Sequence, residues 1–105
     1  MPVFLYRLNP PRPSFPADIT AEEGAAMQSH FGYWAGQMQR GAVLVVGPVP
    51  DPEGTYGIGV LTVDDEAQAR SLCENDPVIA AKLGFTFDLF AMPNAMVRDG
   101  TARAG

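Results

Sequence analysis

Apolar residues are concentrated in four short segments of the chain, which are separated by clusters of Pro, Gly and Asp. These segments are rich in β-branched and aromatic residues, a composition typical of strands. In the third segment polarity alternates, and Gly57 and Gly59 fall on one face, where they leave room for a ring, a backbone or a ligand. The pattern therefore predicts strands over residues 3–8, 42–46, 55–63 and 85–92.

Two segments between the predicted strands have helical periodicity. Thr20 and Glu23 form a capping box, which predicts a helix start, and Gly41 supplies the stop. A second helix begins at the acidic residues 64–66, and Pro77 ends it and can start a short further turn. In the first helix His30 borders the stripe of residues that we expect to face the core, namely Met27, Phe31, Trp34 and Met38.

The order of the predicted elements is strand, helix, strand, strand, helix, strand. This order predicts an α+β, ferredoxin-like βαββαβ fold, with an antiparallel four-stranded sheet and both helices on one face. We expect one domain over residues 1–93, with a proline-rich loop at residues 10–19, and a C-terminal tail at residues 94–105.

The second predicted strand, residues 42–46, is apolar without alternation, so both of its faces should be covered. In the ferredoxin-like topology this strand lies at an edge of the sheet, where exposed apolar surface invites aggregation. A second copy of the chain packed against the sheet would cover it. The sequence therefore predicts a homodimer or a larger homo-oligomer.

Composition narrows the function classes. The net charge is −5, and the seven Lys and Arg residues are scattered, which argues against nucleic acid or a membrane surface as a partner. No leader-like start and no apolar run of about 20 residues is visible, so we expect a cytoplasmic protein. Cys73 is the single cysteine, and its place in a helical pattern predicts a small buried residue. With one histidine and no cysteine cluster, we expect no metal and no cofactor.

His30 and Asp76 are the candidate chemistry. His30 is the single histidine, and Asp76 precedes Pro77 at a backbone corner, where a side chain is held in place. If the fold joins them, the carboxylate orients a general base. Alternatively, His30 is a structural hydrogen-bonding residue and Asp76 only caps the turn. The protein would then be a non-catalytic, dimeric ligand-binding or assembly module. A cleft that reaches His30 favours the enzyme, whereas a pair sealed under Trp34 favours the module.

An ordered series of motifs along nearly the whole chain resembles the YCII-related family. The series comprises His30 with Tyr33-Trp34, Gly41, Val45-Val46-Gly47-Pro48-Val49, Gly54 and Gly57, Asp65-Glu66-Ala67, Asn75-Asp76-Pro77, and residues 85–93. The resemblance implies a dimeric α/β barrel, in which the sheets of two subunits pack together. It also implies a site built on a His–Asp pair, here His30 and Asp76, and lyase-like or dehalogenase-like chemistry on small acids.

The resulting hypothesis is an enzyme of lyase or isomerase type that acts on a small, anionic metabolite. Neutral His30 would remove a proton from this small-molecule ligand, and Asp76 would orient the imidazole ring. Other residues would shape the mouth of the pocket or supply an apolar wall. These candidate substrate-binding residues are Arg12, Tyr33, Trp34, Gly47 and Pro48.

Overall fold

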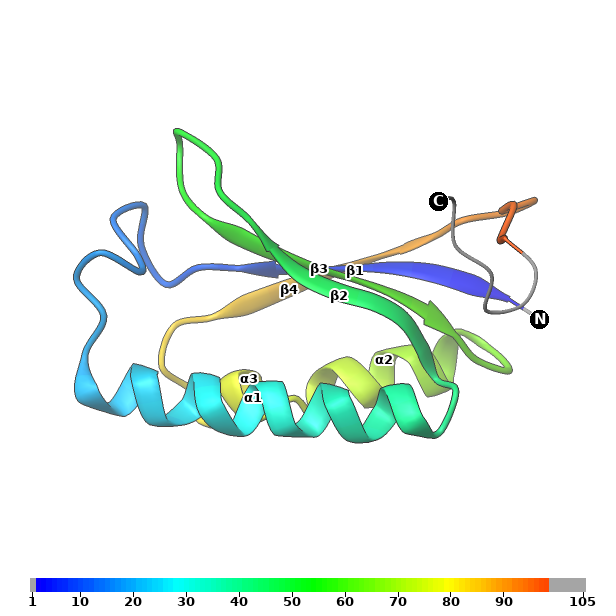
Figure 1. The fold of residues 1–105 in the computed structure, drawn as a ribbon, viewed down its shortest axis with the longest axis horizontal. Coiled ribbons are helices and arrows are strands. Elements are labelled where there is room, and N and C mark those ends of the chain that lie inside the picture. Colours follow the sequence, from blue (N-terminus) through cyan, green and yellow to red (C-terminus); the bar gives the residue numbers. More distant parts are fainter. Residues whose placement is uncertain (1, 99–105) are drawn as a thin grey trace, which may run out of the picture.

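An antiparallel four-stranded sheet forms the molecule, with the helices packed on one of its faces (Figure 1). The computed structural model describes residues 2–98; Met1 and the last part of the predicted tail, residues 99–105, lie outside the described residues. The sheet order is β2-β3-β1-β4. This arrangement confirms the predicted ferredoxin-like fold of the single chain. The elements are β1 (Val3–Asn9), α1 (Ala21–Gln39), β2 (Val43–Val49), β3 (Tyr56–Thr62), α2 (Glu66–Glu74), α3 (Pro77–Ala80) and β4 (Thr86–Ala91).

The core lies between the sheet and the helices. β1 is a central strand, and every second residue along it, Phe4, Tyr6 and Leu8, points into this core. The room that Gly59 leaves on β3 is occupied by a ring, because a Cβ atom built on Gly59 would lie 3.4 Å from Cδ2 of Tyr6. Other buried core residues are Phe15, Trp34, Val43, Leu61, Val63, Ala69, Cys73, Val78 and Phe85.

The predicted capping box at the start of α1 is confirmed. Thr20 accepts a hydrogen bond from the Glu23 backbone, and Glu23 accepts one from the Thr20 backbone. The predicted core stripe, however, is partly wrong, since Phe31 is 57% exposed and Met38 is 45% exposed. The helix is rotated so that His30 faces inward. A polar residue can occupy this position because the fold supplies it with a hydrogen-bonding partner.

The edge strand β2 is longer than predicted and continues through Gly47 and Pro48 to Val49. Proline is compatible with an edge strand because it leaves out only one backbone donor. In the single chain only one face of β2 is covered: Val43 is buried, whereas Val45, which a β-bulge places on the other face, is 48% exposed. No helix within residues 2–98 has the length and apolar character needed to cross a bilayer.

Candidate functional site

The fold brings His30 and Asp76 into direct contact. Nδ1 of the imidazole lies 2.9 Å from Oδ1 and 2.8 Å from Oδ2 of the carboxylate. His30 comes from the inner face of α1. Asp76 is the N-cap of α3, where its side chain accepts a hydrogen bond from the Val78 backbone and Pro77 occupies the first turn. The Asp-Pro corner therefore aims the carboxylate at the middle of α1.

The Asp76 carboxylate is completely buried and accepts hydrogen bonds from several sides. The Tyr6 hydroxyl donates to it at 2.8 Å, and the Trp34 indole N–H donates at 2.7 Å. Burial raises the pKa of Tyr6, so this hydroxyl stays protonated and remains a donor. Burial alone would also raise the pKa of Asp76, but the hydrogen bonds from His30, Trp34 and Tyr6 outweigh it and lower that pKa. Asp76 is therefore an ionised carboxylate, which accepts hydrogen bonds and cannot donate one.

An acceptor-only partner decides the tautomer of His30. Nδ1 must carry the hydrogen that is donated to Asp76, which leaves the lone pair of the neutral ring on Nε2. Within residues 2–98, Nε2 has no hydrogen-bond partner, and it is not sealed from solvent. The ring is thus held as a base with its reactive nitrogen free.

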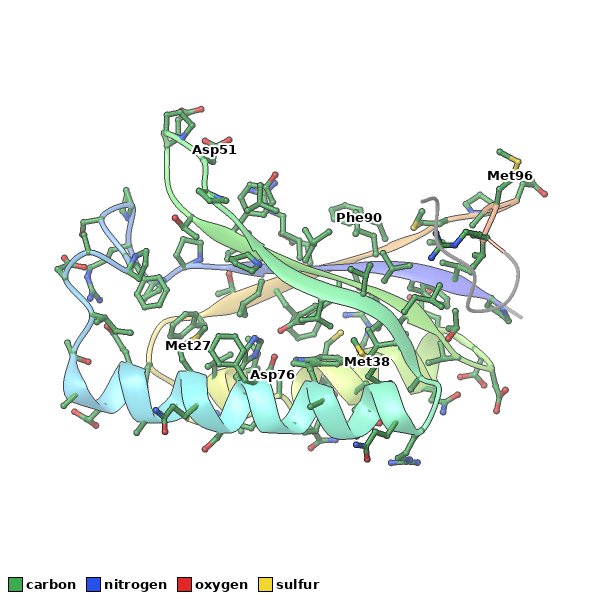
Figure 2. The ribbon with its side chains drawn as sticks, in the orientation of Figure 1. Met27, Met38, Asp51, Asp76, Phe90 and Met96 are labelled. Atoms are coloured by element: carbon green, nitrogen blue, oxygen red, sulfur yellow. The ribbon has the colours of Figure 1, made fainter. Side chains whose placement is uncertain are left out.

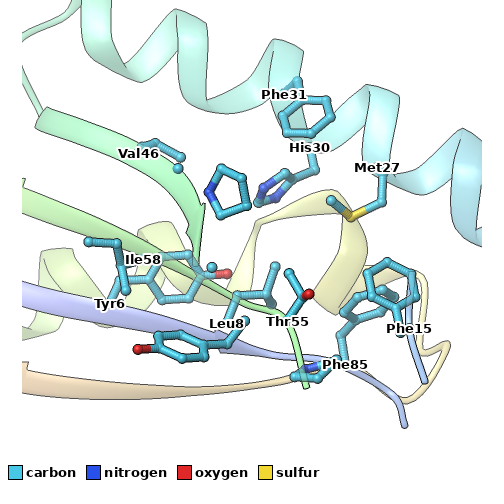
Figure 3. A pocket seen from close by; sticks show the side chains of 15 residues that line it. Tyr6, Leu8, Phe15, Met27, His30, Phe31, Val46, Thr55, Ile58 and Phe85 are labelled. Carbon is cyan, nitrogen blue, oxygen red and sulfur yellow. The ribbon is translucent and has the colours of Figure 1, made fainter. Parts of the chain in front are cut away.

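A cavity of about 150 Å³ lies between α1 and the sheet, and His30 forms part of its wall (Figure 3). The lining is almost entirely apolar, and His30 is the one histidine in it. Asp76 lies behind the ring, outside the lining. The cavity is lined by Tyr6, Leu8, Pro10, Phe15, Met27, His30, Phe31, Val46, Gly47, Pro48, Thr55, Tyr56, Gly57, Ile58 and Phe85.

Only some of the candidate substrate-binding residues line the cavity. Gly47 and Pro48 line the cavity. Trp34 does not, because its indole packs in the core and holds Asp76. Tyr33 and Arg12 are not in the lining either, and the Tyr33 hydroxyl donates to the backbone oxygen of Leu72 at 2.7 Å.

The predicted site residues do not include two residues that line the cavity, Tyr6 and Phe15. Tyr6 both lines the cavity and binds Asp76, and its position between Phe4 and Leu8 on the inward face of β1 was the signal that could have found it. Phe15 lies in the proline-rich loop, where no periodicity indicates which way a side chain faces.

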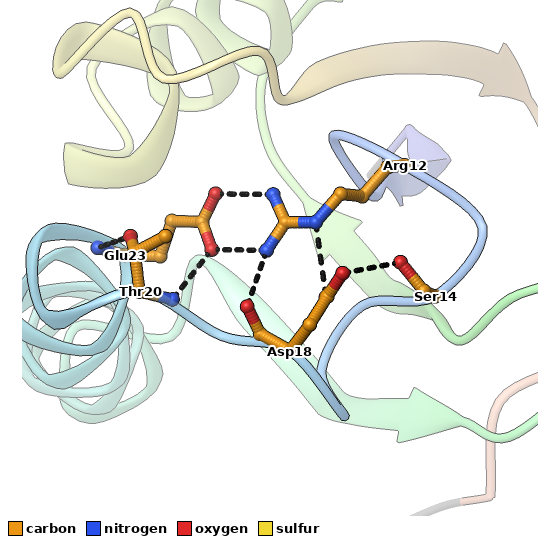
Figure 4. A network of polar contacts seen from close by, with 5 residues as sticks. All are labelled: Arg12, Ser14, Asp18, Thr20 and Glu23. Carbon is orange, nitrogen blue, oxygen red and sulfur yellow. Dashed lines mark hydrogen bonds and ion pairs between the residues drawn. The ribbon is translucent and has the colours of Figure 1, made fainter.

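Arg12 fastens the proline-rich loop to the start of α1 (Figure 4). Its guanidinium makes two parallel contacts with the Glu23 carboxylate, at 2.7 and 2.8 Å, and a third with Asp18 at 2.9 Å. Ser14 donates to Asp18, and the Thr20 backbone donates to Glu23. The hydrogen bonds from Arg12 lower the pKa of Glu23 to about 2. We call these five residues the Arg12 latch.

Because of the Arg12 latch, we expect the free energy of unfolding to fall at acidic pH. A carboxyl group whose pKa is lowered by folding stabilises the folded state fully above its ordinary pKa of 4.5, and this contribution is lost as the pH falls toward about 2. We therefore expect Glu23→Gln to flatten the fall in the free energy of unfolding between these two pH values, as measured by urea denaturation. Glu22→Gln, a neighbouring change outside the latch, is the control. An unchanged pH dependence in Glu23→Gln would contradict the prediction.

Two other kinds of chemistry have to be considered, a reactive thiol at Cys73 and a metal site. Burial, followed by the nearby charge of Asp76, raises the pKa of the Cys73 thiol to about 12. The residue is fully buried, as predicted, and stays a protonated thiol. In the part of the chain that the structure describes, no group of three His, Cys, Asp or Glu side chains is placed to hold a metal ion.

Comparisons with known proteins agree with this fold. No curated protein matches the sequence. Among solved structures, a similar one is the 5-chloro-2-hydroxyhydroquinone dehydrochlorinase of Burkholderia phenoliruptrix, in complex with 2,5-dihydroxybenzoquinone. It has a TM-score of 0.55 and 20% identity, over 84% of this chain and 91% of that one, a likeness that concerns the fold alone. The family model of the YCII-related domain matches residues 4–92. Since the match spans nearly the whole sequence, the chain belongs to the YCII-related family.

Proposed function

We propose that the protein is an enzyme in which His30 acts as a general base on a small molecule held in the cavity. One observation carries the proposal: the Asp76 carboxylate fixes the hydrogen of His30 on Nδ1, so that the lone pair of Nε2 is available at the cavity. A base that is already oriented loses little freedom when it reacts. Asp76 is a positioning residue in this mechanism.

The reaction is a proton abstraction of lyase or isomerase type. Nε2 takes a proton from the substrate, and the imidazolium that forms is stabilised by the adjacent Asp76 carboxylate, which stays ionised. In a lyase the electron pair released by the broken bond forms a double bond, and a leaving group departs with its own bonding pair. In an isomerase His30 returns the proton to another atom of the same molecule.

The cavity favours a substrate about the size of one ring. Its volume of about 150 Å³ resembles that of an apolar cavity in another protein that binds benzene. Although the sequence favoured an anionic metabolite, no Lys or Arg belongs to the lining. We therefore favour a neutral, hydroxyl-bearing ring that acquires negative charge only as His30 removes its proton. The bound quinone of the dehydrochlorinase is a ligand of this size class and supports the idea.

The test compares the wild type with His30→Asn. Turnover is followed as chloride release from 5-chloro-2-hydroxyhydroquinone and from related chlorinated and hydroxylated rings. Loss of the base should lower kcat/KM by roughly 10²–10⁴-fold while the circular dichroism spectrum is retained. Gln28→Asn, a similar change at an exposed position of α1, is the control. A folded His30→Asn variant with full turnover of a substrate would refute the mechanism.

The alternative is a ligand-binding module without chemistry. The observation that separates the two is access to the ring. His30 contributes to the wall of the cavity, whereas a structural histidine would be sealed beneath Trp34. This arrangement favours the enzyme.

We also propose that two copies of the chain pair through the sheet face that the helices leave uncovered. A row of apolar residues crosses that face from one edge strand to the other, because the strand register aligns Val45, Val60, Leu5 and Phe90. Figure 2 shows Phe90 on the side of the sheet away from α1, and its side chain is 50% exposed. A second copy is the expected occupant because the resemblance implies a barrel made of two such sheets.

A further inference from the structure

The proline-rich loop, residues 10–19, lies against two glycines that belong to other parts of the chain. A Cβ atom built on Gly54, in the β2–β3 connection, would lie 3.5 Å from the Pro13 backbone. One built on Gly84, before β4, would lie 3.2 Å from Cβ of Pro11. The loop is therefore packed closely against both segments.

Phe15 is the aromatic residue by which this loop, together with Pro10, lines the cavity. Although it belongs to a loop, it is only 7% exposed. Its ring meets the edge of Phe85, with ring centroids 5.2 Å apart. Both rings line the cavity, as does Met27 of α1 (Figure 3). Phe15 and Phe85 thus form a continuous aromatic wall.

The Arg12 latch holds this wall in place. The backbone N–H of Phe15 donates to the backbone oxygen of Arg12 at 3.1 Å, so the two residues belong to one turn. The guanidinium of the same Arg12 is fixed to Glu23 by two charge-assisted contacts. Movement of the Phe15 backbone away from the cavity has to break the turn or the contacts with α1.

We propose that Phe15 is a specificity-determining residue that limits how long a substituent on a ring-shaped substrate can be. The proposal rests on the function proposed for the cavity. Because His30 and the aromatic wall line the same cavity, a ring that presents its hydroxyl to His30 can carry a substituent that extends to the wall. Longer substituents meet Phe15, and the latch prevents the loop from yielding.

The experiment measures binding of para-alkylphenols, from phenol to hexylphenol, by NMR titration. In the wild type, affinity should rise about fourfold for each added methylene. The affinity should then fall roughly tenfold once the alkyl chain of the phenol meets the aromatic wall, since overfilling a packed site is unfavourable. We expect Phe15→Leu and Phe15→Ala to move this limit to longer chains. Arg12→Gln keeps the ring and releases the latch, and it should move the limit in the same direction even if Phe15→Ala does not fold.

Phe31→Leu is the matched control, because it makes the same change at a residue of the same cavity that lies on α1. An unchanged limit in folded Phe15→Leu would overturn the proposal, as would an equal shift in Phe31→Leu or the absence of any phenol binding. The titrations are repeated in the His30→Asn background, where the limit should persist. If His30→Asn retains turnover while Phe15→Leu still moves the limit, the proposed base fails and the size limit stands.

Discussion

Asp76→Asn should abolish most of the turnover and leave the protein folded. We expect kcat/KM to fall by roughly 10²–10⁴-fold, although the side chain keeps its shape and does not line the cavity. The reason lies in the donors that surround this residue. Tyr6 and Trp34 both donate to Oδ2, so the oxygen of the new amide takes that place.

The amide nitrogen then takes the place of Oδ1 and faces His30. Nδ1 of His30 lies 2.9 Å from this position and 2.8 Å from that of Oδ2, so a donor replaces one of the two acceptors that keep the hydrogen on Nδ1. An amide NH₂ group that donates to Nδ1 favours the tautomer with its hydrogen on Nε2, which has no lone pair at the cavity. The substitution also removes the negative charge that stabilises the imidazolium. A change of one atom behind the ring should therefore weaken the base.

The stability cost of Asp76→Asn should be moderate. One carboxylate acceptor is replaced by a donor next to the Val78 backbone N–H, which loses its partner. A buried donor left without a partner costs about 1–3 kcal/mol, less than the roughly 5–15 kcal/mol by which small domains are stable. Urea denaturation followed by circular dichroism measures this loss separately from the kinetics.

The double variant His30→Asn with Asp76→Asn is the control. Because Asp76 acts through His30, the double variant should be no slower than His30→Asn alone. If the two effects multiply instead, Asp76 has a role of its own. Full activity in folded Asp76→Asn would contradict the tautomer argument.

The fold was predictable because local rules and tertiary packing agree in most segments. The capping box at Thr20 and the acidic residues 64–66 marked helix starts that the structure has, and Asp65 is the N-cap of α2. The orientation of α1 was not predictable, since helical periodicity selects apolar residues such as Phe31. The fold instead turns His30 inward, where the partner that makes its burial favourable is 46 residues away in the sequence.

The candidate site was predictable only in part. The residue types made His30 and Asp76 candidates, but it was a family resemblance that favoured their pairing, because a spacing of this length has no structural meaning by itself. The place of Arg12 was not predictable. Its neighbours are four prolines in a loop without periodicity, and its partner Glu23 already had a role in the capping box.

A second large effect is expected on assembly. Placing glutamate at both Val45 and Phe90 should convert the proposed dimer into a monomer. Each side chain is about half exposed in the single chain, 48% and 50% respectively, so the new carboxylates stay hydrated there and the monomer should fold. In a sheet-to-sheet interface the same carboxylates would lose water without gaining a partner. With two copies of each change, we expect the dissociation constant to rise by roughly 10³-fold or more.

Light scattering and sedimentation at micromolar concentration measure the outcome. Met38→Glu is the matched control, since Met38 is also exposed and apolar, at 45%, but lies on α1 at the other face of the sheet. It should leave the dimer intact. A wild-type chain that is a stable monomer under these conditions would contradict the proposed pairing, and so would a double variant that remains dimeric. The His30 base would be unaffected by either result, because the residues that orient it belong to one chain.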